Sequence, residues 1–171
     1  MTQGTADKFT LMTGEDLTQA ARRTFFAFKD FWAPKFPDGA KIEHVGASAI
    51  PGCLTRGNVD VCVIVKPEMF DDVREKLAGT YDVDIDVEAG DDFAAFVDPA
   101  CRPPLQVQLV VRDSGMDIFV PFRDAMVQDP AIVTAYNVLK KEMVGKPMLE
   151  YRSAQDAFIT YVLENGAAPK R

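Results

Sequence analysis

The chain has 171 residues, of which 47% are hydrophobic and 26% charged, and its net charge is −7. This length predicts one domain with a sizeable core. The acidic balance argues against a nonspecific binder of DNA or RNA, which needs a basic surface, but it does not exclude a small nucleotide. No apolar run reaches the ~18 residues of a membrane span, and the first residues lack a signal-peptide layout. We therefore expect a cytoplasmic protein with no membrane partner.

The hydrophobic pattern predicts a helix first, then a sheet with one crossover helix, then more helices. Helices are predicted at 14–33, 67–78, 117–128, 130–143 and 149–164, where apolar residues recur at helical spacing. Strands are predicted at 41–46, 58–65, 81–88, 93–97 and 105–111, where apolar residues alternate or run together between turn residues. This order indicates an α+β or mixed α/β fold. We expect a single domain over 1–171, with an ordered core over about 14–164.

Side chains alternate across a strand, so each predicted strand has two different sides. The apolar sides are formed by Val59, Val61, Val63 and Val65 and by Leu105, Val107, Leu109 and Val111. The opposite sides carry Asn58, Asp60, Gln106 and Gln108. We expect helices mainly on the apolar face, and convergence of the four polar residues on the other. A third strand exposes Asp82, Asp84 and Asp86, which suit a solvated face.

Asp60 lies near the start of a strand that is otherwise almost entirely apolar. A carboxylate in such a place must be hydrogen-bonded, paired with a cation or bound to a ligand. The loop before it begins with Gly46, Ala47 and Ser48, whose small size lets backbone N–H groups and a hydroxyl approach an anion such as a phosphate. Arg56 would add a permanent positive charge with several donors. These residues predict a binding site around Asp60.

Two sets of residues resemble known motifs. Val45-Gly46-Ala47, followed ten residues later by Asn58-Val59-Asp60-Val61, is similar to the h-G-[GS] and [DE]-h-[DE]-h motifs of the polymerase-β-like nucleotidyltransferase superfamily, where h is apolar. The longer segment "HVGASAIPGCLTRGNVDVCV" resembles the "HIGSTAVPGLxxKxxxDhxV" segment of the GrpB family, also called UPF0157, with Arg56 where a lysine is usual. The later segments "FRDAMVQDPAIVTAYNVLKKEM" and "EYRSAQDAFITYVL" are also similar, so the resemblance runs from about 20 to 163.

The resemblance implies a nucleotidyltransferase-like mixed sheet with a C-terminal helical segment. In active members of that superfamily, three carboxylates hold two divalent metals, usually Mg²⁺, which orient a nucleoside triphosphate (NTP). This sequence departs from the pattern, because Asn58 replaces the first acid and Gln106 or Gln108 stands where the third is expected. An amide oxygen can still bind a metal but brings no charge, so Asp60 is left as the one carboxylate ligand, unless the acids of 81–88 lie on a neighbouring strand. A single carboxylate would hold Mg²⁺ weakly until a triphosphate supplied further anionic oxygens.

Five further residues have interpretations that the sequence leaves open. His44 is either a satisfied histidine beside the sheet or a contact to phosphate or substrate, which the resemblance favours. Arg123 is the best candidate for a second cation at the site. As the alternative for Arg123, and as the expectation for Tyr136, Lys140 and Tyr151, these side chains pack between helices and form surface salt bridges.

Three functions are compatible with these residues. The first is transfer of a nucleotidyl group from an NTP to an unknown small acceptor, with Asp60 on Mg²⁺, Gly46, Ser48 and Arg56 on phosphates, and His44 or Arg123 on the acceptor or leaving group. The second is binding of a nucleotide or phosphorylated metabolite without turnover, which the amides at 58 and 106 favour. The third is an accessory domain, because the resemblance extends to domains fused to dephospho-CoA kinase. The oligomeric state does not follow from the sequence.

Overall fold

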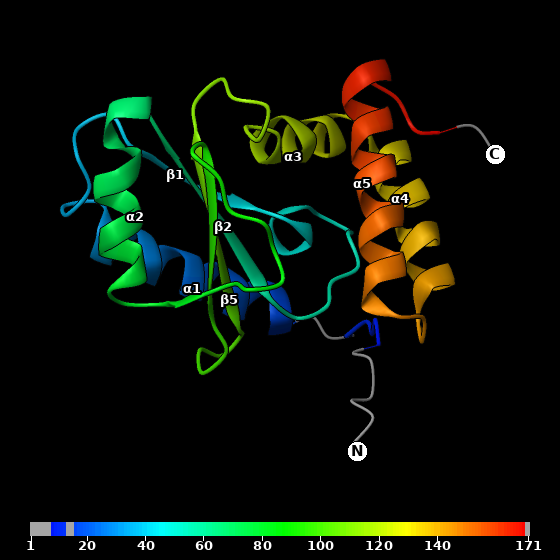
Figure 1. The fold of residues 1–171 in the computed structure, drawn as a ribbon. Helices are drawn as coiled ribbons and strands as arrows, with labels where there is room; N and C mark the ends of the chain where they lie inside the picture. Colours follow the sequence, from blue (N-terminus) through cyan, green and yellow to red (C-terminus); the bar gives the residue numbers. More distant parts are fainter. Residues whose placement is uncertain (1–7, 13–15, 170–171) are drawn as a thin grey trace, which may run out of the picture.

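The computed structural model describes residues 8–12 and 16–169. It contains a five-stranded mixed sheet of order β1-β2-β5-β4-β3 (Figure 1). The strands are β1 (Lys41–Val45), β2 (Val59–Val65), β3 (Asp82–Val83), β4 (Phe93–Asp98) and β5 (Leu105–Val111). The central pair β2 and β5 is parallel and the other pairs are antiparallel. The mixed sheet confirms the predicted fold class.

The helices lie on both sides of this sheet and at one end of it. They are α1 (Asp16–Trp32), α2 (Phe70–Ala78), α3 (Phe119–Gln128), α4 (Pro130–Met143) and α5 (Met148–Asn165), with two 3₁₀ turns, η1 (Ala47–Ala49) and η2 (Pro67–Met69). Figure 1 shows α4 and α5 side by side at the end of the molecule opposite α2. Within the described residues, every helix is too short or too polar to cross a membrane.

One predicted strand is largely wrong. Over 81–88 the chain forms only β3, and a turn follows it. The Asp84 carboxylate accepts a hydrogen bond from the Asp86 backbone N–H at 3.1 Å, which closes a local turn instead of continuing the ladder. Ile85, expected on the apolar side, is 92% exposed. The other predicted elements match the structure to within about three residues, as is usual for element ends, and positions 14 and 15 of the first predicted helix lie outside the described residues.

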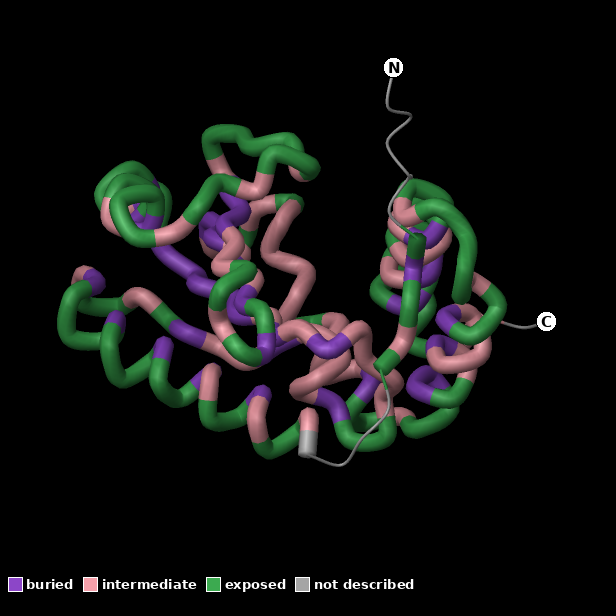
Figure 2. The backbone as a smooth tube through the Cα atoms, turned by 90° about the horizontal axis from the view of Figure 1, so that it is seen from below, coloured by how far each residue is buried: buried purple, intermediate pink, exposed green. Residues whose placement is uncertain are grey.

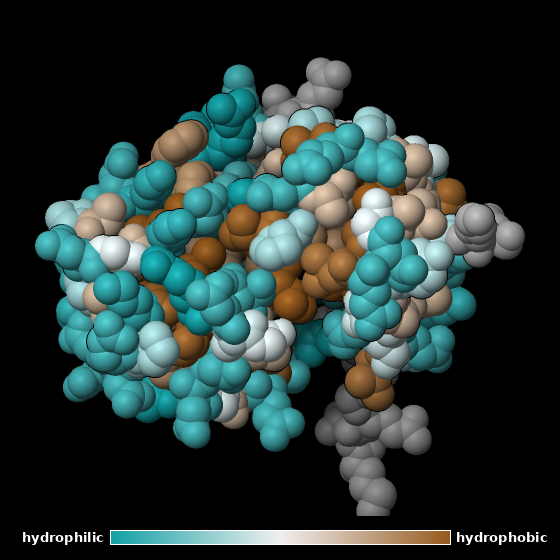
Figure 3. All heavy atoms as spheres, turned by 90° about the horizontal axis from the view of Figure 1, so that it is seen from above, coloured by the Kyte–Doolittle hydropathy of each residue, from teal (hydrophilic) through white to brown (hydrophobic). Residues whose placement is uncertain are grey.

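The valine face of the sheet forms the main core, as the alternation predicts. Val59, Val61, Val63 and Val65 pack with aromatic residues of α1, including Phe25 and Trp32, and with Phe70, Val73 and Leu77 of α2. On the opposite face, Cys62 and Ile64 pack with Phe93 and with partly buried residues at the start of α3. A third cluster joins α3, α4 and α5 (Figure 2). Hydrophobic residues also reach the surface between the sheet and these C-terminal helices (Figure 3).

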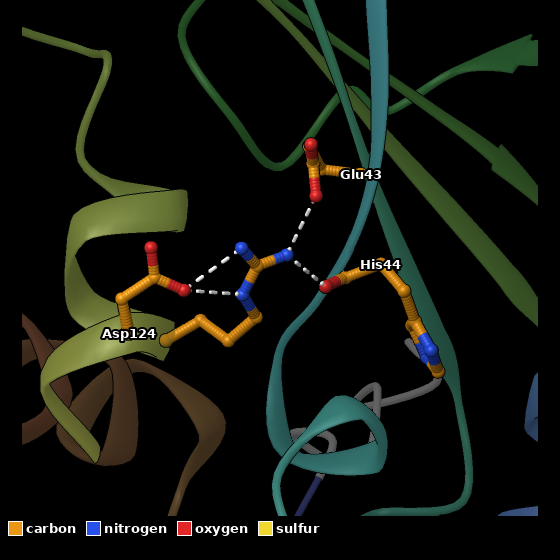
Figure 4. A network of polar contacts seen from close by, with 4 residues as sticks. Glu43, His44 and Asp124 are labelled. Atoms are coloured by element: carbon orange, nitrogen blue, oxygen red, sulfur yellow. Dashed lines mark hydrogen bonds and ion pairs between the residues drawn. The ribbon is translucent and has the colours of Figure 1, made fainter. Parts of the chain in front are cut away.

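A single arginine fastens α3 to the edge of the sheet. Arg123 donates to Glu43 Oε2 at 2.8 Å and to the backbone oxygen of His44 at 2.9 Å, both on β1. It also donates to Asp124 Oδ1 at 2.9 Å. Figure 4 shows the two carboxylates around the guanidinium, with the His44 imidazole pointing away from it. Arg123 therefore positions α3 and leaves little of its guanidinium for a ligand.

We expect Arg123→Gln to lower the free energy of unfolding by about 1–3 kcal/mol, because Glu43 and the His44 carbonyl would each lose a donor. Urea denaturation measures this change. Arg74→Gln is the matched control, since Arg74 pairs with Asp71 at an exposed position and such pairs contribute less than about 1 kcal/mol. Equal losses in the two variants would contradict the anchoring role.

Candidate functional site

The four polar residues predicted to converge do lie together at the start of β2 and β5. Asp60 is paired in register with Gln106 across the parallel strands. Asn58 Nδ2 donates to Asp60 Oδ2 at 2.9 Å and to Gln106 Oε1 at 3.0 Å. Gln108 Nε2 approaches Asp60 Oδ1 at 3.4 Å. The prediction of convergence is therefore confirmed, and the contacts form one network around a single carboxylate.

Both oxygens of Asp60 thus accept hydrogen bonds from amide groups. Burial raises the pKa of Asp60 to about 6, although Gln108, the positive charge of Arg56 and Asn58 each act in the opposite direction. At neutral pH the carboxylate is mostly charged, at a cost in desolvation. The Gln108 Oε1 atom is buried and accepts no hydrogen bond within the described residues. The network therefore has one acceptor free for a further donor.

Gly46 lies directly against the Asp60 carboxylate. Its φ of +71° lies in the left-handed region. A Cβ atom built on it would lie 2.8 Å from Cγ and 2.9 Å from Cβ of Asp60, and closer still to Oδ2. Close approach to the carboxylate therefore requires glycine here even apart from the backbone angle.

The charge of Arg56 acts on this network. Its guanidinium forms no hydrogen bond or ion pair with residues 8–12 or 16–169. Its charge nevertheless lowers the pKa of Asp60, and it acts in the same direction on Tyr151 of α5, whose pKa burial raises. Arg56 is thus near Asp60 and the start of α5 with its donors uncommitted.

The structure does not bring His44 to Asp60. In the β1–β2 register Asp60 is opposite Val45 and His44 is opposite Val61, so His44 lies on the valine face. Its ring stacks on Phe25 of α1, with centroids 4.9 Å apart, and its Nε2 shares a 2.9 Å hydrogen bond with Ser48 Oγ. Burial, followed by the charges of Arg123 and Arg22, lowers the pKa of His44 to about 4.

The predicted phosphate residues are divided between the two faces as a result. Gly46, Asn58, Asp60, Gln106 and Gln108 share one face. His44, Ala47 and Ser48 border a groove of about 850 Å³ on the other, which Asn58 also reaches. Arg123 lies with α3 and belongs to neither group.

The loop between β1 and β2 is held by α4 through residues that the sequence analysis missed or misplaced. Asn137 donates to the Gly52 carbonyl at 2.8 Å and accepts from the Leu54 backbone N–H at 2.8 Å. Lys140 donates to Cys53 Sγ at 3.0 Å and to the Leu54 carbonyl. These contacts fix the loop that carries Gly46 at its start and Arg56 near its end.

Lys140 corrects the expectation of a surface salt bridge. It is 1% exposed, and its ammonium lies 4.2 Å from the centre of the Tyr136 ring. The signal for burial was in the sequence, because Ile132, Tyr136 and Lys140 recur every four residues on the apolar side of α4. The expected packing of Tyr136 and Tyr151 is confirmed, since both are buried and their hydroxyl oxygens are 3.2 Å apart.

The residues around Asp60 do not fit the two-metal site that the resemblance implies. A carboxylate only accepts, so the Asn58 and Gln108 amides turn N–H groups toward it and not the oxygens that Mg²⁺ requires. Asp82 cannot compensate, because β4 and β5 separate β3 from β2 by about 14 Å in total. Within the described residues, acidic, histidine and cysteine side chains nowhere gather in groups of three or more suited to a metal.

We expect Gly46→Ala to lower the free energy of unfolding by at least about 2 kcal/mol more than Gly52→Ala does. The two glycines have nearly the same φ, +71° and +73°, but a Cβ on Gly52 meets no atom within 4 Å. The difference between the variants therefore isolates the collision with Asp60. Urea denaturation measures it, and equal losses would show that Asp60 is not in contact with Gly46.

Asp60→Asn should stabilise the protein at pH 7 by about 2 kcal/mol and have little effect at pH 4. The folded state raises the pKa of Asp60 from 3.8 to about 6 and so binds more protons than the unfolded state between these values. The contribution of Asp60 to stability is therefore lost as pH rises through this window. Denaturation at the two pH values tests this, with exposed Asp82→Asn as control for the loss of one charge. Destabilisation by Asp60→Asn at pH 7 would contradict the expectation.

Solved structures show which fold this arrangement belongs to. The GrpB protein of Enterococcus faecalis superposes with a TM-score of 0.67 at 21% identity, covering 92% of this chain and 95% of that one. The poly(U) polymerase Cid1 with MgGTP bound superposes with a TM-score of 0.51 at 9% identity, over 76% of this chain and 43% of Cid1. This chain thus spans less than half of Cid1, and at such low identity the likeness shows the nucleotidyltransferase-like fold alone.

Sequence comparisons assign the chain more narrowly. A UPF0157 protein of Vibrio cholerae is 32% identical over 135 residues, which are 77% of this chain and 69% of the relative. The family model described as GrpB protein matches residues 15–165. This match spans the sheet, the Asp60 network and the C-terminal helices, so the chain belongs to the GrpB family.

Proposed function

We propose that this chain binds a nucleotide or phosphorylated metabolite at the Asp60 network without metal-dependent transfer. The observation that carries the proposal is that amide N–H groups occupy both oxygens of Asp60. Such a carboxylate is already satisfied as an acceptor of neutral donors, and the described residues place no second acid beside it with which to share a cation.

The charges in the site suggest how such a ligand would lie. Arg56 forms no hydrogen bond or ion pair within the described part of the chain, so its donors suit a phosphate, which it can hold in a bidentate manner. The negative charge of Asp60 repels phosphate and suits hydroxyl or N–H groups of a sugar or base. Gln106 and Gln108 can extend that polar surface along β5. The ligand would therefore place its phosphate toward Arg56 and its sugar or base toward Asp60.

The fixed loop supports this assignment. Asn137 and Lys140 hold the backbone of Gly52 and Leu54, so Arg56 is presented from a loop that is already anchored. Ordering a binding loop before the ligand arrives reduces the entropy lost on binding.

A Mg²⁺-dependent nucleotidyltransferase is the second candidate. Its support is the shared fold with Cid1, whose solved structures contain MgGTP and MgATP, together with the retained acid at Asp60. For transfer, the ligand's own phosphates would have to provide most of the anionic oxygens that the substituted positions Asn58 and Gln106 lack.

One titration distinguishes the two candidates. ATP, GTP, CTP and UTP are added with and without Mg²⁺ while thermal unfolding is followed. A nucleotide at ~100 times its Kd should add ~2.7 kcal/mol to stability. We expect this gain without Mg²⁺, its loss in Arg56→Gln, and its retention in Arg74→Gln, which removes the same charge from the outer surface of α2.

Other outcomes reject the proposal in different ways. A gain that requires Mg²⁺ and disappears in Asp60→Asn would favour the transferase, and release of pyrophosphate from the NTP would then identify turnover. If no nucleotide and no sugar phosphate stabilises the protein, both candidates fail and an accessory role remains.

A further inference from the structure

The groove on the valine face is a second site, separate from the Asp60 network. Its walls come from α1, with Leu17, Arg22 and Phe25, and from the loop between β1 and β2, with Ser48, Ile50 and Leu54. Its volume of about 850 Å³ lies within the range of small-molecule sites, about 300–1,000 Å³. The walls are mostly apolar, so the groove suits a ligand with an apolar or aromatic body.

The charge of the groove differs from that of the whole chain. The chain has 26 acidic residues and a net charge of −7, but none of the described residues that line the groove is acidic. Among the described lining residues the one fully charged side chain is Arg22, which is exposed and makes no hydrogen bond or ion pair with residues 8–12 or 16–169. An uncompensated guanidinium beside apolar walls favours an anion.

The polar groups on the floor of the groove are neutral. His44 and Ser48 are joined by their 2.9 Å hydrogen bond, and Phe25 stacks on the imidazole. With a pKa of about 4, His44 carries no charge near neutral pH. The groove therefore offers one positive charge, which matches a single negative charge on the ligand. When His44 Nε2 carries the imidazole proton and donates it to Ser48 Oγ, the Ser48 hydroxyl can donate to that ligand.

We propose that this groove binds a small aromatic monoanion, with its anionic group on Arg22 and Ser48 and its ring against Phe25, Ile50 and Leu54. The site is distinct from the nucleotide site proposed above, because His44 and Asp60 face opposite sides of the sheet. Asn58 touches both, since it borders the groove and donates to Asp60.

The probe that tests this site is 8-anilinonaphthalene-1-sulfonate, an aromatic monosulfonate whose fluorescence rises on binding. The native protein should bind it saturably, with one molecule per chain. Arg22→Gln should raise its Kd by roughly 10-fold, because a charge-assisted hydrogen bond is lost. The neutral probe N-phenyl-1-naphthylamine should bind equally well to both proteins.

Arg23→Gln is the matched control. Arg23 is the next residue of α1, bears the same charge and bonds to Gln19, but does not border the groove. It should leave the Kd of the sulfonate within twofold of wild type. Thr18→Trp, at an exposed position on the wall, should fill the groove and abolish binding of both probes.

Three results would overturn the assignment: no saturable binding to the native protein, equal weakening by Arg22→Gln and Arg23→Gln, or binding unaffected by Thr18→Trp. Circular dichroism of each variant separates loss of the site from loss of the fold. Arg56→Gln should bind the sulfonate like wild type, so failure of the nucleotide site and failure of this one are distinguishable.

Discussion

The contact between the Gly46 backbone and the Asp60 carboxylate determines how the rest of the site is built. The carboxylate is at the start of a core strand, and a side chain at position 46 would collide with it. The loop must therefore leave β1 through a glycine with positive φ. This exit sends Ala47 and Ser48 toward α1 and leaves Asp60 to the amides of β2 and β5. The close contact between Gly46 and Asp60 thus places residues of one continuous sequence motif on two faces of the sheet.

The C-terminal helices hold the other end of the same loop. Burial lowers the pKa of Lys140, while the nearby Cys53 acts in the opposite direction. An amine buried in this way costs free energy unless its protons are bonded, and Cys53 and the Leu54 carbonyl accept them. The helical segment therefore does more than cover the sheet, because it also fixes the loop from which Arg56 extends.

Much of this arrangement follows from the sequence because it depends on local periodicity. Strand alternation correctly placed Asn58, Asp60, Gln106 and Gln108 on one face. The side of the sheet that His44 occupies depends on the register between β1 and β2, which periodicity within one strand does not specify. The partners of Arg123 on β1 lie about 80 residues away, so no local pattern could reveal them. The strand predicted at 81–88 is mostly absent because the Asp84 carboxylate accepts a hydrogen bond from the Asp86 backbone N–H, which closes a turn there.

The two ends of the sheet show how it avoids pairing with another chain. Exposed edge strands present unpaired backbone groups that can template aggregation. At one edge, Arg123 donates a hydrogen bond to the backbone carbonyl of His44 on β1. At the other, β3 is only two residues long, and the chain then turns away with Asp84 and Asp86 around exposed Ile85. The acidic segment after β3 therefore protects this edge of the sheet. It places negative charge and a bend where another strand could otherwise pair with β3.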